Sequence, residues 1–289
     1  MTDDNAGHSN ASAAGPLPPH LPPAAVGATG GRGMLAGRRL LVVGGGQQDY
    51  GQNHPPIGIG RAISLLAARE GAAVAVADLD LAAASGTAER ITAEGGAAIA
   101  LAVDAADATQ SARMVADAAE ALGGLDALVL NTGIAYGLGL AGTTGDDWDR
   151  VFAVNVRAHF LVLQAAMPIF EPGGAVTMTS STAARVVSTT DIPAYTTSKA
   201  ALEGLCTYAA KELAARRVRV NVVMAGLIDT SLGRLASQVR PDRASIPIPL
   251  GRQGTGWDIA HATVFLLSDA ASYITAVTLP VDGGLSHVH

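Results

Sequence analysis

The sequence predicts an α/β protein built on one doubly wound parallel sheet of about seven strands, with helices on both faces. The chain has 289 residues, of which 49% are hydrophobic and 4% aromatic, a composition that suits packed α/β layers better than an all-β sandwich. From Leu40 onward, short runs rich in Val, Leu and Ile alternate with longer stretches of helical period. The short runs lack polar alternation, so both faces of each strand should be buried, as in a parallel sheet.

The alternation fixes the order of the predicted elements. The predicted strands are residues 39–44, 72–78, 97–104, 125–131, 174–180, 218–226 and 276–284. The predicted helices are Gly58–Glu70, Leu81–Glu94, Ala106–Leu122, Asp147–Phe170, Ala194–Ala215 and Trp257–Ser268. With no internal repeat and no linker, residues 34–289 are expected to form a single domain. Ligands of such sheets bind beyond the carboxyl ends of the strands, so the strand exits should carry the chemistry.

The N-terminal segment and the overall charge exclude several classes of protein. Residues 1–33 are rich in Ala, Gly, Pro, Ser and Asn and predict a disordered tail. Asp3 and Asp4 precede no apolar stretch, which excludes a signal peptide, and no apolar run reaches the ~18 residues of a membrane span. A net charge of -6 without a basic stripe argues against nucleic-acid or membrane partners. We therefore expect a soluble, cytoplasmic protein, in which the single cysteine, Cys206, is a buried hydrophobe.

Glycines and a carboxylate at the first two strand exits indicate dinucleotide binding. The first strand runs into glycines, and a helix begins at Gly58 and Gly60, where its N-terminus can hold a pyrophosphate. Asp78 ends the second strand, where a carboxylate can accept both adenosine ribose hydroxyls and would repel a 2′-phosphate. The pattern favours NAD over NADP. An alternative role for Asp78 is to cap the following helix.

Polar residues also follow the third and fourth strands. Asp104 could accept the adenine amino group, although Asp104 or Asp107 could instead cap the next helix. Asn131 and Gly133 form a turn of small residues against which a ribose could pack, or an ordinary turn.

A tyrosine and a lysine are the main candidate catalytic residues. Tyr195 and Lys199 are four residues apart and share one face of a predicted helix. Tyrosine has an unperturbed pKa of about 10, and a nearby ammonium group favours the phenolate. The preceding strand exits into Ser180 and Ser181, whose hydroxyls could bind a substrate oxygen. Asn155 lies inside a predicted helix, where asparagine is unfavourable and usually has a partner or a task.

These motifs, in this order over residues 40–284, resemble the short-chain dehydrogenase/reductase family. The resemblance implies a Rossmann-type fold and an NAD(H)-dependent oxidoreductase that interconverts a secondary alcohol and a ketone without a metal. It implies that Tyr195 is the general acid/base, that Lys199 binds the nicotinamide ribose and lowers the tyrosine pKa, and that Ser181 holds the substrate oxygen. Ser180 is disfavoured for that role, and Asn155 would hold a water in a proton relay.

The resemblance also assigns the cofactor site. The residues expected to bind the cofactor are Gly45, Gly46, Gly58, Ile59, Gly60, Asp78, Leu79, Asp104, Ala105, Asn131, Thr132, Gly133, Tyr195, Lys199, Gly226, Ile228 and Thr230. Departures from the family pattern are mild: Gly44 replaces a threonine, and Ala225-Gly226 replaces a Pro-Gly pair.

The larger departure is an insertion, QQDYGQNHPPI, which adds about nine residues between glycines that should be close together. It could be a surface bulge, a flap in which Gln47 to Asn53 cover the cofactor, a metal site through His54 and Asp49, or a subunit contact. Because Pro55-Pro56 stiffens its return, we expect Gly58 and Gly60 to reach the pyrophosphate and Gly45 or Gly46 to lie on the ribose side.

The substrate side is less defined. Tyr136, Val187 and Leu232 are candidate pocket residues. Residues 231–249 correspond to the family's mobile lid, and their three arginines, Arg234, Arg240 and Arg243, are either solvated or pair with a substrate carboxylate.

Family resemblance implies a homotetramer or homodimer acting on a small molecule. The alternative function is a non-catalytic NAD(H)-binding sensor. An enoyl reductase is disfavoured, because its tyrosine and lysine are more widely spaced.

Overall fold

The computed structural model describes residues 30–186, 191–240, 243 and 245–288. Most of the predicted tail and Val187 therefore lie outside the described residues. One sheet of parallel strands runs in the order β3-β2-β1-β4-β5-β6-β9. Its strands are β1 (Arg39–Val43), β2 (Ala73–Asp78), β3 (Ala98–Ala102), β4 (Leu125–Leu130), β5 (Phe170–Ser181), β6 (Arg219–Ala225) and β9 (Thr278–Val281). The predicted seven-stranded parallel sheet is confirmed.

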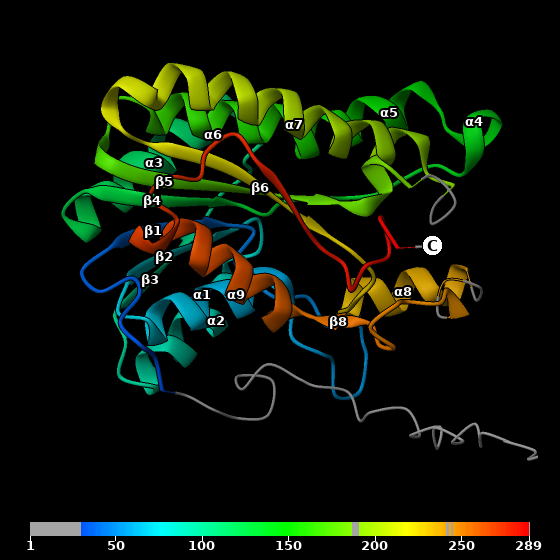
Figure 1. Cartoon of the computed structure of the whole chain (residues 1–289), viewed down its shortest axis with the longest axis horizontal. Helices are drawn as coiled ribbons and strands as arrows, with labels where there is room; N and C mark the ends of the chain where they lie inside the picture. The colour runs from blue at the N-terminus through cyan, green and yellow to red at the C-terminus, as the bar shows by residue number, and fades with distance from the viewer. Residues whose placement is uncertain (1–29, 187–190, 241–242, 244, 289) are drawn as a thin grey trace, which may run out of the picture.

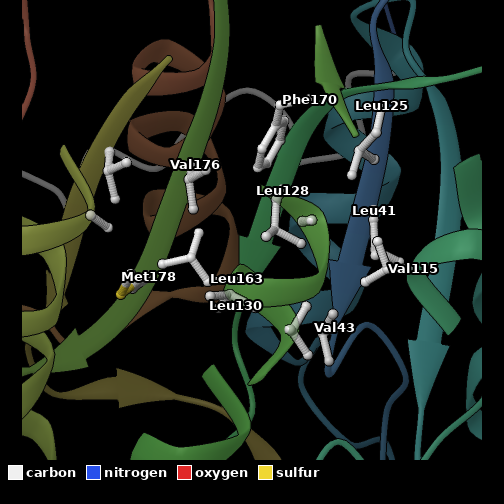
Figure 2. Close-up of a cluster of buried hydrophobic side chains, with 14 of the residues drawn as sticks. Leu41, Val43, Val115, Leu125, Leu128, Leu130, Leu163, Phe170, Val176 and Met178 are labelled. Carbon is white, nitrogen blue, oxygen red and sulfur yellow. The ribbon is translucent and has the colours of Figure 1, made fainter. Parts of the chain in front are cut away.

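Helices cover both faces of the sheet (Figure 1). On one side lie α3 (Ala108–Leu122), α6 (Ala158–Ala166) and α7 (Pro193–Leu213), and on the other α1 (Ile59–Arg69), α2 (Leu81–Ala93) and α9 (Gly256–Leu267). The core follows the same division. Figure 2 shows the cluster on the α3 and α6 side, where Leu128, Phe170 and Val176 are fully or almost fully buried.

Strand order reverses between β1 and β4, which are neighbours in the sheet although α1 to α3 intervene in the chain. The crossovers leaving β1 and β4 diverge at this point, and a crevice opens beyond their carboxyl ends. Among the described residues, no helix is both long and apolar enough to cross a bilayer.

The predicted helix 147–170 is confirmed as helical up to Ala166, although it is not one regular α-helix, and it is wrong in its last four residues. The segment forms α5 (Gly145–Phe152), a π-helical turn at Ala153–Arg157, and α6, and Phe170 begins β5. Phe170 pairs with Leu125 in the sheet and is 1% exposed, so tertiary burial determines its conformation. Pro168 lacks an N–H and marks the break between helix and strand.

The region after β6 contains more regular structure than the sequence indicated. β7 (Ile228–Asp229) pairs with β8 (Gly254–Thr255), and α8 (Ser231–Val239) lies between them in the chain. Thr230 caps α8 by accepting a hydrogen bond from the Gly233 N–H at 3.0 Å. The predicted lid therefore begins as a capped helix. The short helix α4 (Gly139–Gly142) was also not predicted.

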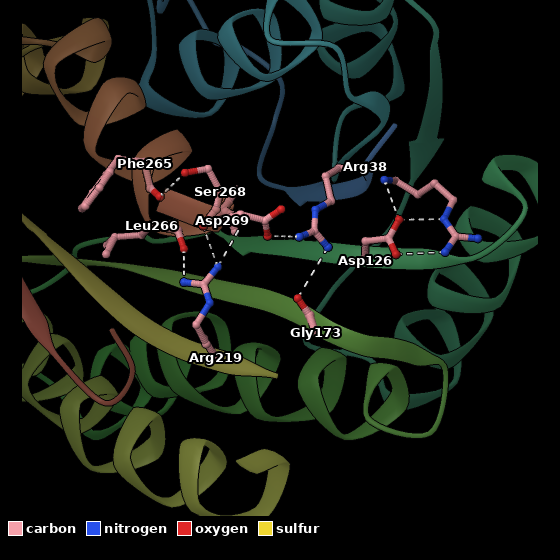
Figure 3. Close-up of polar contacts among 10 residues, drawn as sticks. Arg38, Asp126, Gly173, Arg219, Phe265, Leu266, Ser268 and Asp269 are labelled. Carbon is pink, nitrogen blue, oxygen red and sulfur yellow. Dashed lines mark hydrogen bonds and ion pairs between the residues drawn. The ribbon is translucent and has the colours of Figure 1, made fainter. Parts of the chain in front are cut away.

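A buried arginine joins β6 to the end of α9 (Figure 3). Arg219 is 8% exposed, and its guanidinium donates to the carbonyls of Leu266, Leu267 and Ser268. The last carbonyls of a helix have no partner within the helix, so this side chain satisfies groups that burial would otherwise leave unpaired.

We expect Arg219→Met to lower the free energy of unfolding by about 2–3 kcal/mol, because it leaves these carbonyls without a charged donor. Urea unfolding followed by circular dichroism measures the change. The control is Arg113→Met, which removes an exposed ion pair with Asp117 on α3 and should cost less than about 0.5 kcal/mol. Equal losses for the two variants would contradict the capping role of Arg219.

Candidate active site

A pocket of about 540 Å³ lies beyond the carboxyl ends of the strands. Every strand from β1 to β6 contributes residues to its wall at or just beyond the strand's carboxyl end. The predicted site residues that line it are Gly46, Gly58, Ile59, Gly60, Asp78, Leu79, Asp104, Ala105, Asn131, Thr132, Gly133, Ser181, Tyr195, Lys199, Gly226, Ile228, Thr230 and Leu232. The structure thus brings together residues that are up to 186 positions apart in the chain (Gly46 to Leu232).

Three predicted residues are not part of the wall. Gly45 faces the interior, where a Cβ would lie 2.8 Å from Val76 and where its carbonyl accepts from Thr87. The Tyr136 ring stacks against the Arg150 guanidinium, with 4.4 Å between the ring centroid and Arg150 Cζ. Arg150 lines the pocket, whereas Tyr136 does not. Asn155 lies behind the wall.

The first turn depends on a close contact between two glycines. A Cβ on Gly60 would lie 1.9 Å from the Gly44 carbonyl oxygen, so no other residue fits there without moving the backbone. Gly44 itself has φ of +79°, a left-handed conformation that favours glycine. These two positions let the start of α1 approach the end of β1, as a phosphate-binding turn requires.

The insertion Gln47–Pro56, which we call the flap, closes on both the phosphate turn and the lid. Gln47 Oε1 accepts the Gly58 N–H at 3.0 Å, at the N-terminus of α1. Gln52 Nε2 donates to the Ser231 carbonyl at 2.7 Å, at the start of α8. Gln47, Gln48 and Tyr50 line the pocket, which favours the flap interpretation of the insertion over a surface bulge.

The metal interpretation of the flap gains no support. Asp49 accepts the Gly51 N–H within its own turn. Over the described ranges, no cluster of three or more His, Cys, Asp or Glu side chains forms that could hold a metal ion.

Two carboxylates line the β2 and β3 end of the pocket. Asp78 accepts the Gly46 N–H at 2.9 Å, which fixes its carboxylate beside the phosphate turn. The caps of the following helices are other residues: Asp80 caps α2 and Asp107 caps α3. Asp78 and Asp104 are therefore not needed as helix caps.

The tyrosine and lysine lie at the opposite side of the crevice, on α7. The Lys199 ammonium is 5.8 Å from the centroid of the Tyr195 ring and donates to the Thr179 carbonyl at 3.0 Å. Burial lowers the pKa of Lys199 to about 8. A Cβ on Gly133 would lie 3.0 Å from the ammonium, so the turn after β4 also contacts the lysine closely.

Burial raises the pKa of Tyr195, whereas a hydrogen bond with Ser181 and the positive charge of Arg243 lower it. Burial outweighs both, so the pKa of Tyr195 lies above its ordinary value, opposite to the lowering expected from Lys199. The structure also separates the two serines. Ser180 donates to the Lys199 carbonyl at 2.8 Å, while Ser181 borders the pocket and contacts the tyrosine.

Asn155 is fully buried in the π-helical turn and joins three elements. Its Oδ1 accepts the Ile134 N–H at 2.8 Å, and its Nδ2 donates to the Ile134 carbonyl and the Ser198 hydroxyl, each at 2.9 Å. These bonds give Asn155 a positioning role between the β4 turn and α7, and its expected role in holding a water stays a prediction. Nearby, burial lowers the pKa of His159 to about 3, and its Nε2 contacts Thr132.

The sequence did not show which of the three lid arginines face the pocket. Arg240 and Arg243 line the pocket, whereas Arg234 pairs with Asp229 at 2.7 Å and does not. Tyr50 also reaches the wall from the flap. No local pattern marks these side chains, since the fold of the lid and flap determines which of them turn inward.

Comparison with known proteins supports one family. Residues 56–286 match the family model described as enoyl-(acyl carrier protein) reductase. The chain is 35% identical over 256 residues to 2,5-dichloro-2,5-cyclohexadiene-1,4-diol dehydrogenase of Sphingobium indicum, covering 87% of this chain and 97% of that one. It is 34% identical to 3-oxoacyl-[acyl-carrier-protein] reductase of Thermotoga maritima, covering 79% and 93%. A short-chain dehydrogenase/reductase structure from Burkholderia xenovorans matches with a TM-score of 0.80, 33% identity and coverage of 88% and 98%.

The bond between the flap and α8 generates a test. We expect Gln52→Ala to raise hydrogen–deuterium exchange about fivefold at the amides of the first turns of α8, because it removes one hydrogen bond that holds this end. Mass spectrometry of peptides covering 231–239 measures the rates. Gln48→Ala, which loses a bond to Asp80 instead, should leave α8 unchanged. Unaltered exchange in Gln52→Ala would show that the flap does not restrain the lid.

Proposed function

Because the chain belongs to the short-chain dehydrogenase/reductase family, we propose that it interconverts a secondary alcohol and a ketone using NAD(H). The observation that carries this proposal is the convergence of Tyr195, Ser181 and Lys199 on one pocket. A phenol in contact with a serine hydroxyl is suited to exchange a proton with an oxygen that the serine holds. The relatives named as a diol dehydrogenase and as an oxoacyl reductase support the same class of reaction.

The residues present fit a dinucleotide. The Gly44–Gly60 contact creates a cradle at a helix N-terminus for the pyrophosphate, and Asp78 lies beside it for a ribose. Ser231 borders the pocket, and its hydroxyl is buried without a partner within the described part of the chain, so it can bond to a polar ligand group. The nicotinamide, when bound, accepts or supplies the hydride.

The protein's own groups handle the oxygen and the proton. In oxidation, Ser181 orients the alcohol, and Tyr195 as phenolate accepts its proton; in reduction, the phenol returns it. Since burial raises the tyrosine pKa, the phenol dominates at neutral pH and is ready to act as the acid. Oxidation requires the phenolate, so its rate should rise with pH. Lys199, held by the Thr179 carbonyl, places a positive charge near the ring.

Reduction of a carbon–carbon double bond, which the family model's description names, is a weaker candidate. Only three residues separate Tyr195 from Lys199, and both lie on one helix beside Ser181, an arrangement that suits a carbonyl oxygen. A purely NAD(H)-sensing protein would not need this set of groups, so no observation favours the sensor.

We also propose that the protein forms a homodimer or homotetramer through α6 and α7. Phe160 on α6 is 45% exposed and Tyr208 on α7 is 62% exposed. Burying such aromatic side chains favours association.

The tyrosine carries a direct test. We expect Tyr195→Phe to reduce turnover by at least about 10³-fold, because it removes the acid/base hydroxyl while retaining the ring. Absorbance of NADH over a panel of secondary alcohols from pH 6 to 10 measures the rates. The affinity for NADH, measured by fluorescence, should change little. Substantial activity in Tyr195→Phe would remove the tyrosine from its role, and cofactor binding without turnover in wild type would favour the sensor.

Cofactor choice depends on Asp78. We expect Asp78→Ala to weaken NAD binding about 10-fold or more, because the ribose hydroxyls lose an ionised acceptor, and to improve the relative affinity for NADP. Isothermal titration calorimetry with both dinucleotides measures this. The matched control is Asp80→Ala, which removes only a helix cap and a contact with the flap. A wild-type preference for NADP would contradict the role of Asp78.

A further inference from the structure

Charge is distributed unevenly along the pocket. The acidic residues that the described chain places in its wall are Asp78, at the end of β2, and Asp104, just after β3, at one side of the sheet. The lid beyond β6, at the other side, contributes Arg240 and Arg243 next to the catalytic tyrosine. A ligand that spans the crevice therefore meets carboxylates at one end and guanidinium groups at the other.

Arg243 is held in place by neutral partners. Its Nη1 donates to the Gly233 carbonyl and to the Ser237 hydroxyl, each at 3.0 Å, and the side chain is half-buried. Two acidic residues of the described chain pair with other arginines: Asp229 with Arg234 at 2.7 Å, and Asp191 with Arg240 at 3.7 Å. The charge of Asp229 also acts on Arg243 and raises its pKa, but less strongly than burial lowers it. The hydrogen bonds orient the guanidinium but do not neutralise its charge.

Arg243 and Tyr195 line the same pocket, so the positive charge of Arg243 acts at the end of the pocket where we propose the reaction takes place. The two groups attract each other, so the guanidinium lowers the pKa of the phenol, while burial lowers the pKa of the arginine itself. Keeping a cation partly buried is costly unless an anion or strong hydrogen bonds compensate it. Both of the bonds described come from Nη1, and a guanidinium also has donors on Nε and Nη2, the pair that binds an oxyanion side-on.

We propose that Arg243 binds an oxyanion of the substrate, so that the natural substrate is a secondary alcohol or ketone carrying a carboxylate, sulfonate or phosphate near the reacting carbon. This inference rests on the proposed function, because it places the substrate beside Tyr195. Arg243 is then a specificity-determining residue. The alternative is that Arg243 acts only on the tyrosine, which would affect charged and neutral substrates equally.

The test uses substrates matched in shape but not in charge. 3-Hydroxybutanoate and 4-hydroxypentanoate are compared with their methyl esters, and hydroxyalkyl sulfonates and phosphates of similar length distinguish the kinds of oxyanion. The enzymes are wild type, Arg243→Met, Arg243→Lys and the control Arg234→Met, whose arginine pairs with Asp229 outside the pocket. The readouts are kcat and KM, with circular dichroism confirming that each variant folds.

We expect wild type to prefer an anionic substrate to its neutral analogue. Arg243→Met should lower kcat/KM for the anion by about 10- to 100-fold, mainly through KM, and for the ester by less than about threefold. Arg243→Lys should be intermediate, since lysine keeps the charge but not the fork of donors. A wild-type enzyme that prefers esters, or equal losses for acid and ester in Arg243→Met, would overturn the inference.

A failure of the proposed function is recognised separately. If no alcohol or ketone is turned over in a Tyr195-dependent way, the hydride-transfer function fails. Calorimetric binding of 3-oxobutanoate, with and without NADH, then decides the role of Arg243. Binding to wild type but not to Arg243→Met supports the oxyanion site, and equal binding or no binding to both contradicts it.

Discussion

The close contact between the end of β1 and the start of α1 is the constraint on which the pocket depends. Gly60 must lie against the Gly44 carbonyl for α1 to begin beside the sheet, and no side chain fits between them. This contact aims the N-terminus of α1 at the crevice where strand order reverses. The flap lies between Gly46 and Gly58 in the chain and extends over the pocket toward α8, so its extra residues leave the contact between Gly44 and Gly60 intact.

Buried hydrogen bonds position the end of the pocket that contains Tyr195 and Lys199. Asn155 ties the turn after β4 to Ser198 on α7, and Ser180 holds the carbonyl of Lys199 on the same helix. Thr179 then fixes the lysine ammonium from β5. Satisfied buried hydrogen bonds make such a cluster rigid, and a rigid support allows a phenol and a serine to hold a small oxygen in one geometry.

Most of the fold could be predicted from the sequence, because fully buried strands appear in it as continuous apolar runs. Glycines and carboxylates mark the positions where these strands end. The Tyr195–Lys199 spacing likewise predicted a shared helix face, and the structure places both on α7. Three features could not be predicted: that β5 starts at Phe170, that Asn155 positions α7 through Ser198, and that burial raises the pKa of Tyr195. Each arises from contacts between segments far apart in the chain, which local periodicity does not encode. The inward position of Arg243 has the same origin.

The flap joins two parts of the pocket wall that are far apart in the chain. It contacts the phosphate turn through Gln47 and the lid helix through Gln52, so one short segment bonds to the N-terminus of α1 and to the start of α8. A displacement of α8 would therefore pull on the turn that follows β1. The two ends of the pocket are mechanically coupled by a stretch of chain that belongs to neither.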